Sequence, residues 1–279
     1  INWSAGYLSE KGFKESRLHV ELLLCHVLGC RRIELYTNFD KVLGAGQRAA
    51  FKSLFKRRLT HEPLQYILGE VEFMAYRFAV DRRVLIPRPE TELLVEEVLQ
   101  HLRDRSGSLR ILDIGTGSGN IAISLANRIS ACTVDAIDVS PDALAVARDN
   151  VQRHGVAGRV RLLEIDILQP DAIVPAADYD IIVSNPPYIS REDFLQLQPE
   201  IQNYEPAIAT TDLKDGLTFF RRIAAVGRTL LPSAGMLFVE IACDQSAAVQ
   251  EIFFDLGYRD IVMVKDYGGM PRIVKARRA

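Results

Sequence analysis

Short apolar runs alternate with stretches of helical periodicity along the second half of the chain. The runs cover residues 110–114, 133–137, 160–165, 181–184 and 236–241. Between them, apolar side chains recur every three or four residues, as in 142–154 and 217–230. Buried strands that alternate with helices of this length are typical of parallel βαβ units.

The end of the chain has a different pattern. Residues 261–264 and 273–276 are two apolar runs separated by a turn with the sequence Asp-Tyr-Gly-Gly. We expect a terminal hairpin whose last strand runs antiparallel to its neighbours. The whole pattern predicts an α/β fold with a Rossmann-like, mostly parallel seven-stranded sheet.

The first 70 residues contain no strand pattern and read as helical. One helix is expected to end at Gly29 and a second to cover 47–60. The apolar positions at helical spacing are Leu18, Leu22, Cys25 and Leu28 in the first helix, and Phe51, Leu54, Phe55 and Leu59 in the second.

Partial alternation over 71–84 predicts a two-stranded connector, and a helix is expected over 90–102 with Pro89 in its first turn. We therefore expect the chain to divide into a small helical domain (1–70), a β-hairpin connector (71–85) and an α/β domain (86–279). Small helical domains that precede an α/β core usually dock a substrate, and we expect this of residues 1–70.

A glycine loop follows the first strand of the predicted sheet. Its sequence from Asp113 is Asp-Ile-Gly-Thr-Gly-Ser-Gly-Asn, and glycines in this place let a ligand approach the backbone at a helix N-terminus. A dinucleotide fingerprint requires G-x-G-x-x-G, whereas the spacing here is G-x-G-x-G. The departure favours a ligand without phosphate groups.

The next two strands end in acidic residues. Asp138 stands twenty-odd residues after the first glycine, where a carboxylate can accept hydrogen bonds from ribose hydroxyls. Asp166 and Ile167 end the third strand and suit the edge and the face of an adenine ring.

The fourth strand ends in Asn185-Pro186-Pro187-Tyr188. Two prolines cannot continue a central strand, so they form a stiff turn. The Asn185 side chain and the Pro186 carbonyl can then face outward as acceptors, beside an aromatic ring. Two acceptors and a ring suit a planar –NH2 group, which points to chemistry on an amide or amino nitrogen. Taken alone, these four residues could also form an ordinary turn that ends a strand.

The order of these four strand ends resembles a class I S-adenosylmethionine-dependent methyltransferase. More narrowly, the chain resembles the PrmC/HemK family, which methylates a glutamine side-chain nitrogen in bacterial peptide chain release factors. The further segments that carry the resemblance are 62–69, 86–92, Glu205-Pro206, 215–217, and 266–269 with Arg272. One departure is Ala242, where the family usually has Gly.

The resemblance implies S-adenosyl-L-methionine as cofactor, S-adenosyl-L-homocysteine as product, and release factors as protein substrates. Catalysis and substrate binding are assigned to Asn185, Pro186, Pro187 and Tyr188. The residues implied in cofactor binding are Asp113, Gly115, Thr116, Gly117, Ser118, Gly119, Asp138, Val139, Asp166, Ile167 and Asn185. We expect no metal, because the cysteines and histidines do not cluster.

Composition limits the remaining choices. The net charge of −2 argues against general nucleic-acid binding, and no apolar run approaches the roughly 18 residues of a membrane span. The four scattered cysteines and the lack of a signal-peptide pattern favour the cytoplasm. We expect a monomer. The cluster of Lys52, Lys56, Arg57 and Arg58 is interpreted as a solvated helix face in preference to a patch that docks a partner.

Alternatives remain open at this point. The motif Asn-Pro-Pro-Tyr would accept adenine or cytosine equally well, so a nucleic-acid amino-methyltransferase fits the core motifs. A glutamine methyltransferase acting on a ribosomal protein fits them too. A non-enzymatic S-adenosylmethionine sensor would not need Asn185.

Overall fold

The computed structural model describes residues 1–170 and 178–279. The chain forms two compact units, Ile1–Glu70 and Val71–Ala279. Each unit has hydrophobic clusters of its own and is described here by itself. Within the described ranges, no helix is long and apolar enough to cross a membrane.

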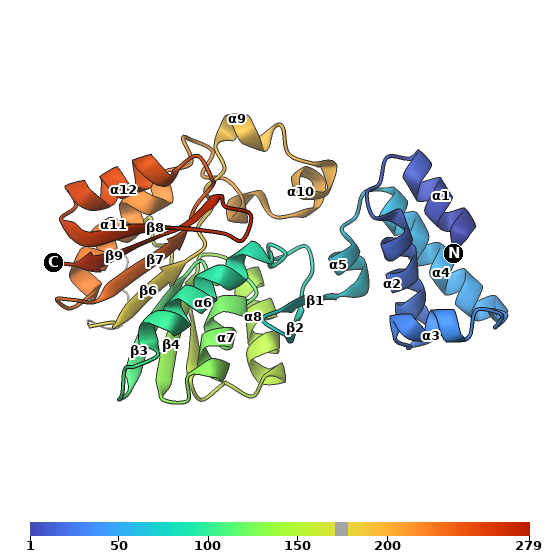
Figure 1. The fold of residues 1–279 in the computed structure, drawn as a ribbon, viewed down its shortest axis with the longest axis horizontal. Helices are drawn as coiled ribbons and strands as arrows, with labels where there is room; N and C mark the ends of the chain where they lie inside the picture. Colours follow the sequence, from blue (N-terminus) through green and yellow to red (C-terminus); the bar gives the residue numbers. More distant parts are fainter. Residues whose placement is uncertain (171–177) are drawn as a thin grey trace. The chain divides into compact units, whose positions relative to one another are not determined.

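Helices make up the first unit (Figure 1). They are α1 (Asn2–Glu10), α2 (Ser16–Leu28), α3 (Arg32–Thr37), α4 (Ala45–Leu59) and α5 (Leu64–Leu68). The predicted helix ending at Gly29 is confirmed, since Gly29 caps α2 in the left-handed conformation. Its most buried apolar side chains are Val20, Leu23 and Leu24 rather than the predicted positions, because α2 packs against both α1 and α4.

The basic stretch of α4 is not simply a solvated face. Arg58 is buried, with its guanidinium 4.3 Å from the centre of the Phe13 ring and a hydrogen bond to the Glu62 carbonyl. Arg57 makes two hydrogen bonds to the Glu62 carboxylate, at 2.7 and 2.8 Å. The expectation of a solvated face is therefore wrong for Arg58 and holds for Lys52 and Lys56, which are exposed.

The second unit is built on a seven-stranded sheet with the order β5-β4-β3-β6-β7-β9-β8. The strands are β3 (Leu109–Ile114), β4 (Cys132–Asp138), β5 (Val160–Glu164), β6 (Ile181–Ser184), β7 (Met236–Glu240), β8 (Tyr258–Lys265) and β9 (Pro271–Arg278). Neighbouring strands from β5 to β7 are parallel. The last strand, β9, lies antiparallel between β7 and β8. The predicted fold class is confirmed.

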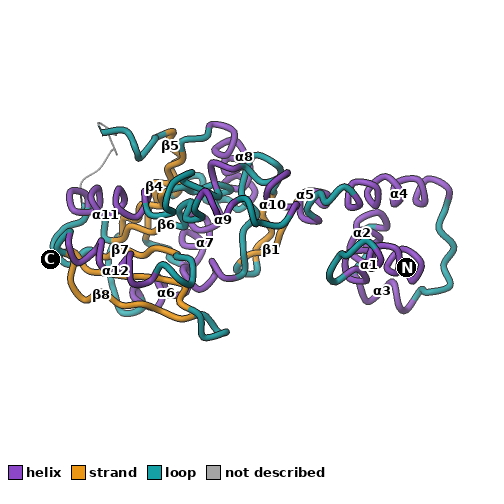
Figure 2. The backbone as a smooth tube through the Cα atoms, turned by 90° about the horizontal axis from the view of Figure 1, so that it is seen from above, coloured by secondary structure: helices purple, strands orange, loops and turns teal. Residues whose placement is uncertain are grey.

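Helices cover both faces of this sheet (Figures 1 and 2). On one face lie α6 (Glu90–Leu102), α7 (Asn120–Arg128) and α8 (Pro141–Arg153), and on the other α11 (Thr218–Leu230) and α12 (Ser246–Asp255). Successive strand residues enter opposite cores: Ile111 packs in the first cluster and Leu112 in the second. Burial on both faces explains why the central strands are continuously apolar.

The predicted connector is a separate two-stranded sheet, β1 (Glu70–Phe73) and β2 (Tyr76–Ala79). Met74 and Ala75 at its turn both have positive φ, as the tight turns of β-hairpins require. The Met74 N–H donates to the Glu92 carboxylate at 2.6 Å. Asn150 of α8 bonds to both the N–H and the carbonyl of Ala79. These contacts hold the hairpin against α6 and α8.

Several elements lie outside the predicted pattern. Between β6 and α11 the structure has the short helices α9 (Arg191–Phe194) and α10 (Pro199–Tyr204) and the 3₁₀ turn η1 (Ala207–Ala209). Helix α12 was also not predicted, and β8 and β9 extend beyond 261–264 and 273–276. Apolar periodicity is weak in these short segments, and the ends of the hairpin strands are polar where they face solvent.

A close helix–strand contact in the second core gives a test of the packing. A Cβ atom added at Gly227 of α11 would lie 2.4 Å from the Tyr258 hydroxyl, which is buried and donates to the Ala224 carbonyl. Gly227→Ala should therefore lower the free energy of unfolding by about 1–3 kcal/mol, measured by urea denaturation. Gly158→Ala is the control, because no atom lies within 4 Å of its added Cβ. Equal stability of the two variants would contradict this packing.

Candidate active site

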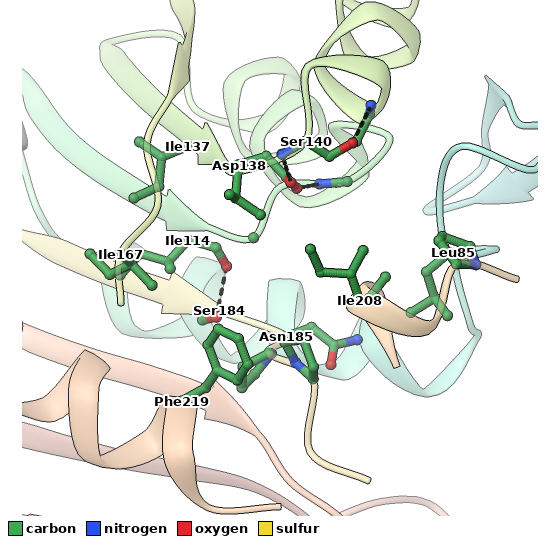
Figure 3. A pocket seen from close by; sticks show the side chains of 18 of the residues that line it. Leu85, Ile114, Ile137, Asp138, Ser140, Ile167, Ser184, Asn185, Ile208 and Phe219 are labelled. Atoms are coloured by element: carbon green, nitrogen blue, oxygen red, sulfur yellow. Dashed lines mark hydrogen bonds between the residues drawn. The ribbon is translucent and has the colours of Figure 1, made fainter. Parts of the chain in front are cut away.

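A cavity of about 220 Å³ lies at the carboxyl ends of the parallel strands. Its walls include the ends of β3, β4 and β6 and the residues that follow β5. Strand order reverses between β3 and β6, and ligands of open α/β sheets bind at such a reversal. Figure 3 shows Asp138 and Ser140 on one side of the cavity and Ser184, Asn185 and Phe219 on the other.

The three glycines of the loop after β3 all have positive φ, but Gly119 has a different environment from the other two. Gly115 and Gly117 line the cavity, and the space beside their Cα atoms is empty. A Cβ at Gly119 would lie 3.0 Å from Ile123 and 3.4 Å from Ala147. The first two glycines therefore leave room for a ligand, and the third permits close packing of α7 on α8.

Asp113 supports the loop from behind. It is fully buried and accepts a hydrogen bond from the Thr116 hydroxyl at 2.6 Å. The Thr116 N–H in turn donates to the Ile137 carbonyl of β4. Burial raises the pKa of the Asp113 carboxyl to about 7, and the hydrogen bond from Thr116 acts in the opposite direction.

Asp138 connects the loop to the next helix. One carboxylate oxygen accepts from the Gly117 N–H at 2.9 Å and the other from the Ser140 N–H at 3.0 Å. Burial raises the pKa of Asp138, against these backbone hydrogen bonds. Asp138 lines the cavity together with Val139. Its carboxylate can therefore bind a ligand as well as fix the backbone at Gly117 and at Ser140.

The segment after β5 contributes Asp166 and Ile167 to the cavity wall. The Asp166 carboxylate accepts from the Leu168 N–H and from the Gln169 side chain, both at 2.9 Å. Ile167 is buried and offers an apolar surface. Residues 171–177 lie outside the described ranges.

The turn after β6 places three of its residues, Asn185, Pro186 and Pro187, in the cavity wall. The preceding Ser184 is buried and donates to the Ile114 carbonyl at 2.7 Å, which ties the ends of β6 and β3 together. The Asn185 amide nitrogen donates to the Thr91 hydroxyl at 3.1 Å. Asn185 Oδ1 is thereby the acceptor of this side chain that can serve a ligand.

Tyr188 lies behind this wall instead of lining the cavity. Its hydroxyl donates to the Glu240 carboxylate at 3.1 Å, and its ring packs against the second hydrophobic cluster. Its carbonyl accepts a hydrogen bond from the Gln245 side chain at 2.8 Å. Gln245 also accepts from the Ala242 N–H. Ala242 stands where the family usually has Gly, and the turn after β7 forms with this residue at negative φ.

Of the residues that the sequence implied for the cofactor, seven line the cavity: Gly115, Gly117, Asp138, Val139, Asp166, Ile167 and Asn185. The remaining four do not line the cavity and instead make contacts that support the loop: Asp113, Thr116, Ser118 and Gly119. Ser118 accepts at its carbonyl from Asn150 of α8. Among the described residues, no group of three or more His, Cys, Asp or Glu side chains could hold a metal ion.

Two segments that contribute to the cavity wall, 83–88 and 205–209, were not assigned as site residues from the sequence. Together with the start of α11 they contribute Arg83, Val84, Leu85, Pro206, Ile208, Ala209 and Phe219 to the wall. Glu205 joins the two segments, because its carboxylate pairs with the Arg88 guanidinium and accepts from the Ile86 N–H at 3.2 Å. The signal was present in the sequence, since 86–92 and Glu205-Pro206 both carried the family resemblance.

The buried Asp113 predicts a dependence of stability on pH. Its pKa of about 7 in the folded protein lies above the value of 3.8 for an unperturbed carboxyl, so the folded state binds the proton more tightly. The free energy of unfolding should therefore fall as pH rises from about 4 to about 7, by at most about 1.4 kcal/mol per pH unit from this group. Urea denaturation at several pH values would measure it.

Asp113→Asn should flatten this slope, because the amide is neutral throughout the range. Asp135→Asn is the control: despite the opposing effect of burial, the ion pair with Arg161 lowers the pKa of Asp135, so that group titrates below the window. An unchanged slope in Asp113→Asn would contradict the assignment.

The chain has extensive similarity to known proteins. Family models match for the PrmC N-terminal domain over residues 1–69 and for the methyltransferase small domain over residues 89–201. The release factor glutamine methyltransferase of Geobacter sulfurreducens is 42% identical over 99% of this chain and 95% of its own length. That of Bordetella pertussis is 44% identical over 92% of this chain and 93% of its own length.

Among solved structures, a release factor-specific protein-(glutamine-N5) methyltransferase from Alicyclobacillus acidocaldarius is 31% identical and covers 69% of this chain and 94% of that chain, with a TM-score of 0.43. Each of the two curated relatives is matched over more than nine-tenths of this chain and of its own length. The chain therefore belongs to the release factor glutamine methyltransferase family.

Proposed function

We propose that this protein transfers a methyl group from S-adenosyl-L-methionine to the side-chain amide nitrogen of a glutamine in peptide chain release factors. The observation that carries the proposal is the position of Asn185 in the wall of the same cavity as the glycine loop. A methyl donor and an amide nitrogen can then meet in one cavity.

The cavity residues fit this cofactor. The open space beside Gly115 and Gly117 admits a ligand without phosphate groups, and the Asp138 carboxylate can accept from ribose hydroxyls. Val139 and Ile167 offer apolar contact for an adenine ring, with Asp166 at its edge. When bound, the cofactor supplies an electrophilic methyl group on a positively charged sulfur and leaves as S-adenosyl-L-homocysteine.

The protein's task is to make a weak nucleophile reactive. The lone pair of an amide nitrogen is delocalised into its carbonyl group. Asn185 Oδ1 and the Pro186 carbonyl would accept hydrogen bonds from the two N–H groups of the glutamine, orient the nitrogen and stabilise the positive charge that develops on it. After transfer the nitrogen is acidic and loses its proton without a dedicated base.

Pro187 stiffens the wall, and we assign Tyr188 as the aromatic cover of the substrate amide. Because its hydroxyl donates to Glu240 and its ring lies behind the wall, this role requires the ring to turn toward the cavity when the substrate binds. The four residues of the turn thus divide into two acceptors, one rigid spacer and one ring.

The division of the chain into a docking domain (1–70), a connector (71–85) and a catalytic domain (86–279) belongs to the same proposal. It is supported by the separate helical core of Ile1–Glu70. We further propose that the protein works as a monomer in the cytoplasm and does not bind nucleic acid directly, in keeping with its net charge of −2.

The mechanism predicts that Asn185→Ala lowers kcat by about a hundredfold or more, as the loss of one transition-state hydrogen bond does elsewhere. The affinity for S-adenosyl-L-methionine, measured by calorimetry, should change much less. Mass spectrometry of release factor after incubation would measure methylation. Asn127→Ala, in the last turn of α7, is the control and should retain full activity. Near-normal methylation by Asn185→Ala would refute the mechanism.

The domain division predicts that a chain lacking residues 1–70 binds the cofactor but methylates intact release factor poorly. Remote binding energy normally positions the reacting group, so its loss should appear in turnover as well as in affinity. A short glutamine peptide makes few remote contacts, so its slow methylation should fall far less. Equal rates of both enzymes on intact release factor would rule out docking by residues 1–70.

A further inference from the structure

Four polar side chains from three distant parts of the sequence form a hydrogen-bonded chain behind the cavity wall. Asn185 Nδ2 donates to Thr91 Oγ1 at 3.1 Å, and Thr91 Oγ1 donates to Glu240 Oε2 at 2.6 Å. The Tyr188 hydroxyl donates to the other oxygen, Glu240 Oε1, at 3.1 Å. Thr91 lies in the first turn of α6 and Glu240 ends β7. Both are at most 2% exposed.

The direction of these hydrogen bonds determines how the Asn185 amide is oriented. A carboxylate only accepts, so Glu240 takes the one proton of the Thr91 hydroxyl. The lone pairs of the Thr91 oxygen are then left to accept, and the neighbouring group of Asn185 must be its NH2. An amide has almost the same shape when its oxygen and nitrogen are exchanged, so packing alone cannot distinguish the two orientations. The hydrogen bond to Thr91 does distinguish them.

This orientation matters at the substrate. With Nδ2 turned toward Thr91, Oδ1 is the atom that can accept from the N–H group of a bound glutamine. With the amide turned over, two N–H donors would face each other, and the developing positive charge would meet the positive end of the amide dipole. The reaction then loses one of its two acceptors.

We propose that Thr91 and Glu240 are positioning residues, which hold the Asn185 amide with its oxygen toward the reacting nitrogen. The inference rests on the proposed function, because it concerns the same site. It also gives a role in the site to Thr91 in the segment 86–92 and to Glu240 at the end of β7.

The burial of Glu240 supports a role in the site over a role in folding. A carboxylate at the end of a central strand loses its hydration, which weakens the folded state unless partners compensate. Burial raises the pKa of Glu240, whereas the hydrogen bonds from Thr91 and Tyr188 and the charge of Arg272 act in the opposite direction. All the hydrogen-bond partners of this carboxylate named above lead to the turn after β6.

The test compares Thr91→Val with Thr91→Ser. Valine has the shape of threonine but no hydroxyl, and serine keeps the hydroxyl. We expect Thr91→Val to lower kcat on release factor by about tenfold or more, and Thr91→Ser to stay within about threefold of the wild type. KM for release factor and the affinity for S-adenosyl-L-methionine should change little in both, since neither remote docking nor the cofactor wall contains Thr91.

Three results would overturn the proposal. The first is a kcat for Thr91→Val within twofold of the wild type. The second is an equal loss of kcat in Thr91→Ser, and the third is a loss in Thr91→Val that appears in KM and cofactor affinity instead of kcat. The last two would indicate an effect of packing and not of the hydroxyl. If Thr91→Val does not fold, Glu240→Gln takes its place. The two hydroxyls donate to different oxygens of Glu240, and in Gln one of these positions is an NH2 donor, so kcat should again fall while KM stays.

Nuclear magnetic resonance separates this proposal from the proposed function. In protein with ¹⁵N-labelled asparagine, the Asn185 side-chain protons should exchange slowly with water in the wild type and in Thr91→Ser, and faster in Thr91→Val. Failure of the wild type to methylate release factor would refute the proposed function. Equal exchange rates in the three proteins would refute the hydrogen bond on which the positioning depends.

Discussion

The parallel pairing of β3 with β4 on one edge and with β6 on the other is the constraint on which the site depends. Ile114 at the end of β3 lies in register with Ile137 and with Ser184. Three chain segments that are far apart in sequence therefore leave the sheet side by side. Because the chain turns in opposite directions from this point, the crossover helices diverge and a cavity remains between the loops. The glycine loop and the Asn185 turn both border it.

The loops at this cavity are held by buried polar groups, each of which costs stability when its partners are incomplete. Asp113 fixes the start of the glycine loop through Thr116, and Asp138 fixes its middle through the Gly117 N–H. The glycine loop itself has too few apolar side chains to be held in place by packing. The hydrogen bonds give the backbone one conformation, at the expense of carboxyl groups whose pKa values are raised by burial. Rigidity of the site and stability of the fold are therefore in competition here.

The sequence predicted the strands well because the parallel strands are buried on both faces and carry continuous apolar runs. It also predicted the strand ends that border the cavity, from the Gly, Asp and Pro residues that stand there. It could not predict the partners of those groups. Nothing in the spacing of Thr91 and Glu240, 149 residues apart, indicates that they share a hydrogen bond. Helix α12 was missed because only Val249 and Phe253 of its apolar residues are buried, so its pattern is not clearly one-sided. The turn η1 has three residues, too few to show a helical period.

The segment that follows the hairpin shows how one short stretch can serve several distant parts of the site. At its start, Ile86 and Arg88 bind the Glu205 carboxylate, which holds the wall residues Leu85 and Pro206 near each other. Three residues further on, Thr91 binds Asn185 and Glu240. The rigid proline on each side of Arg88 fixes the backbone between these contacts. A shift of this segment would move the cofactor wall and the Asn185 amide together, so the two halves of the reaction are aligned by the same stretch of chain.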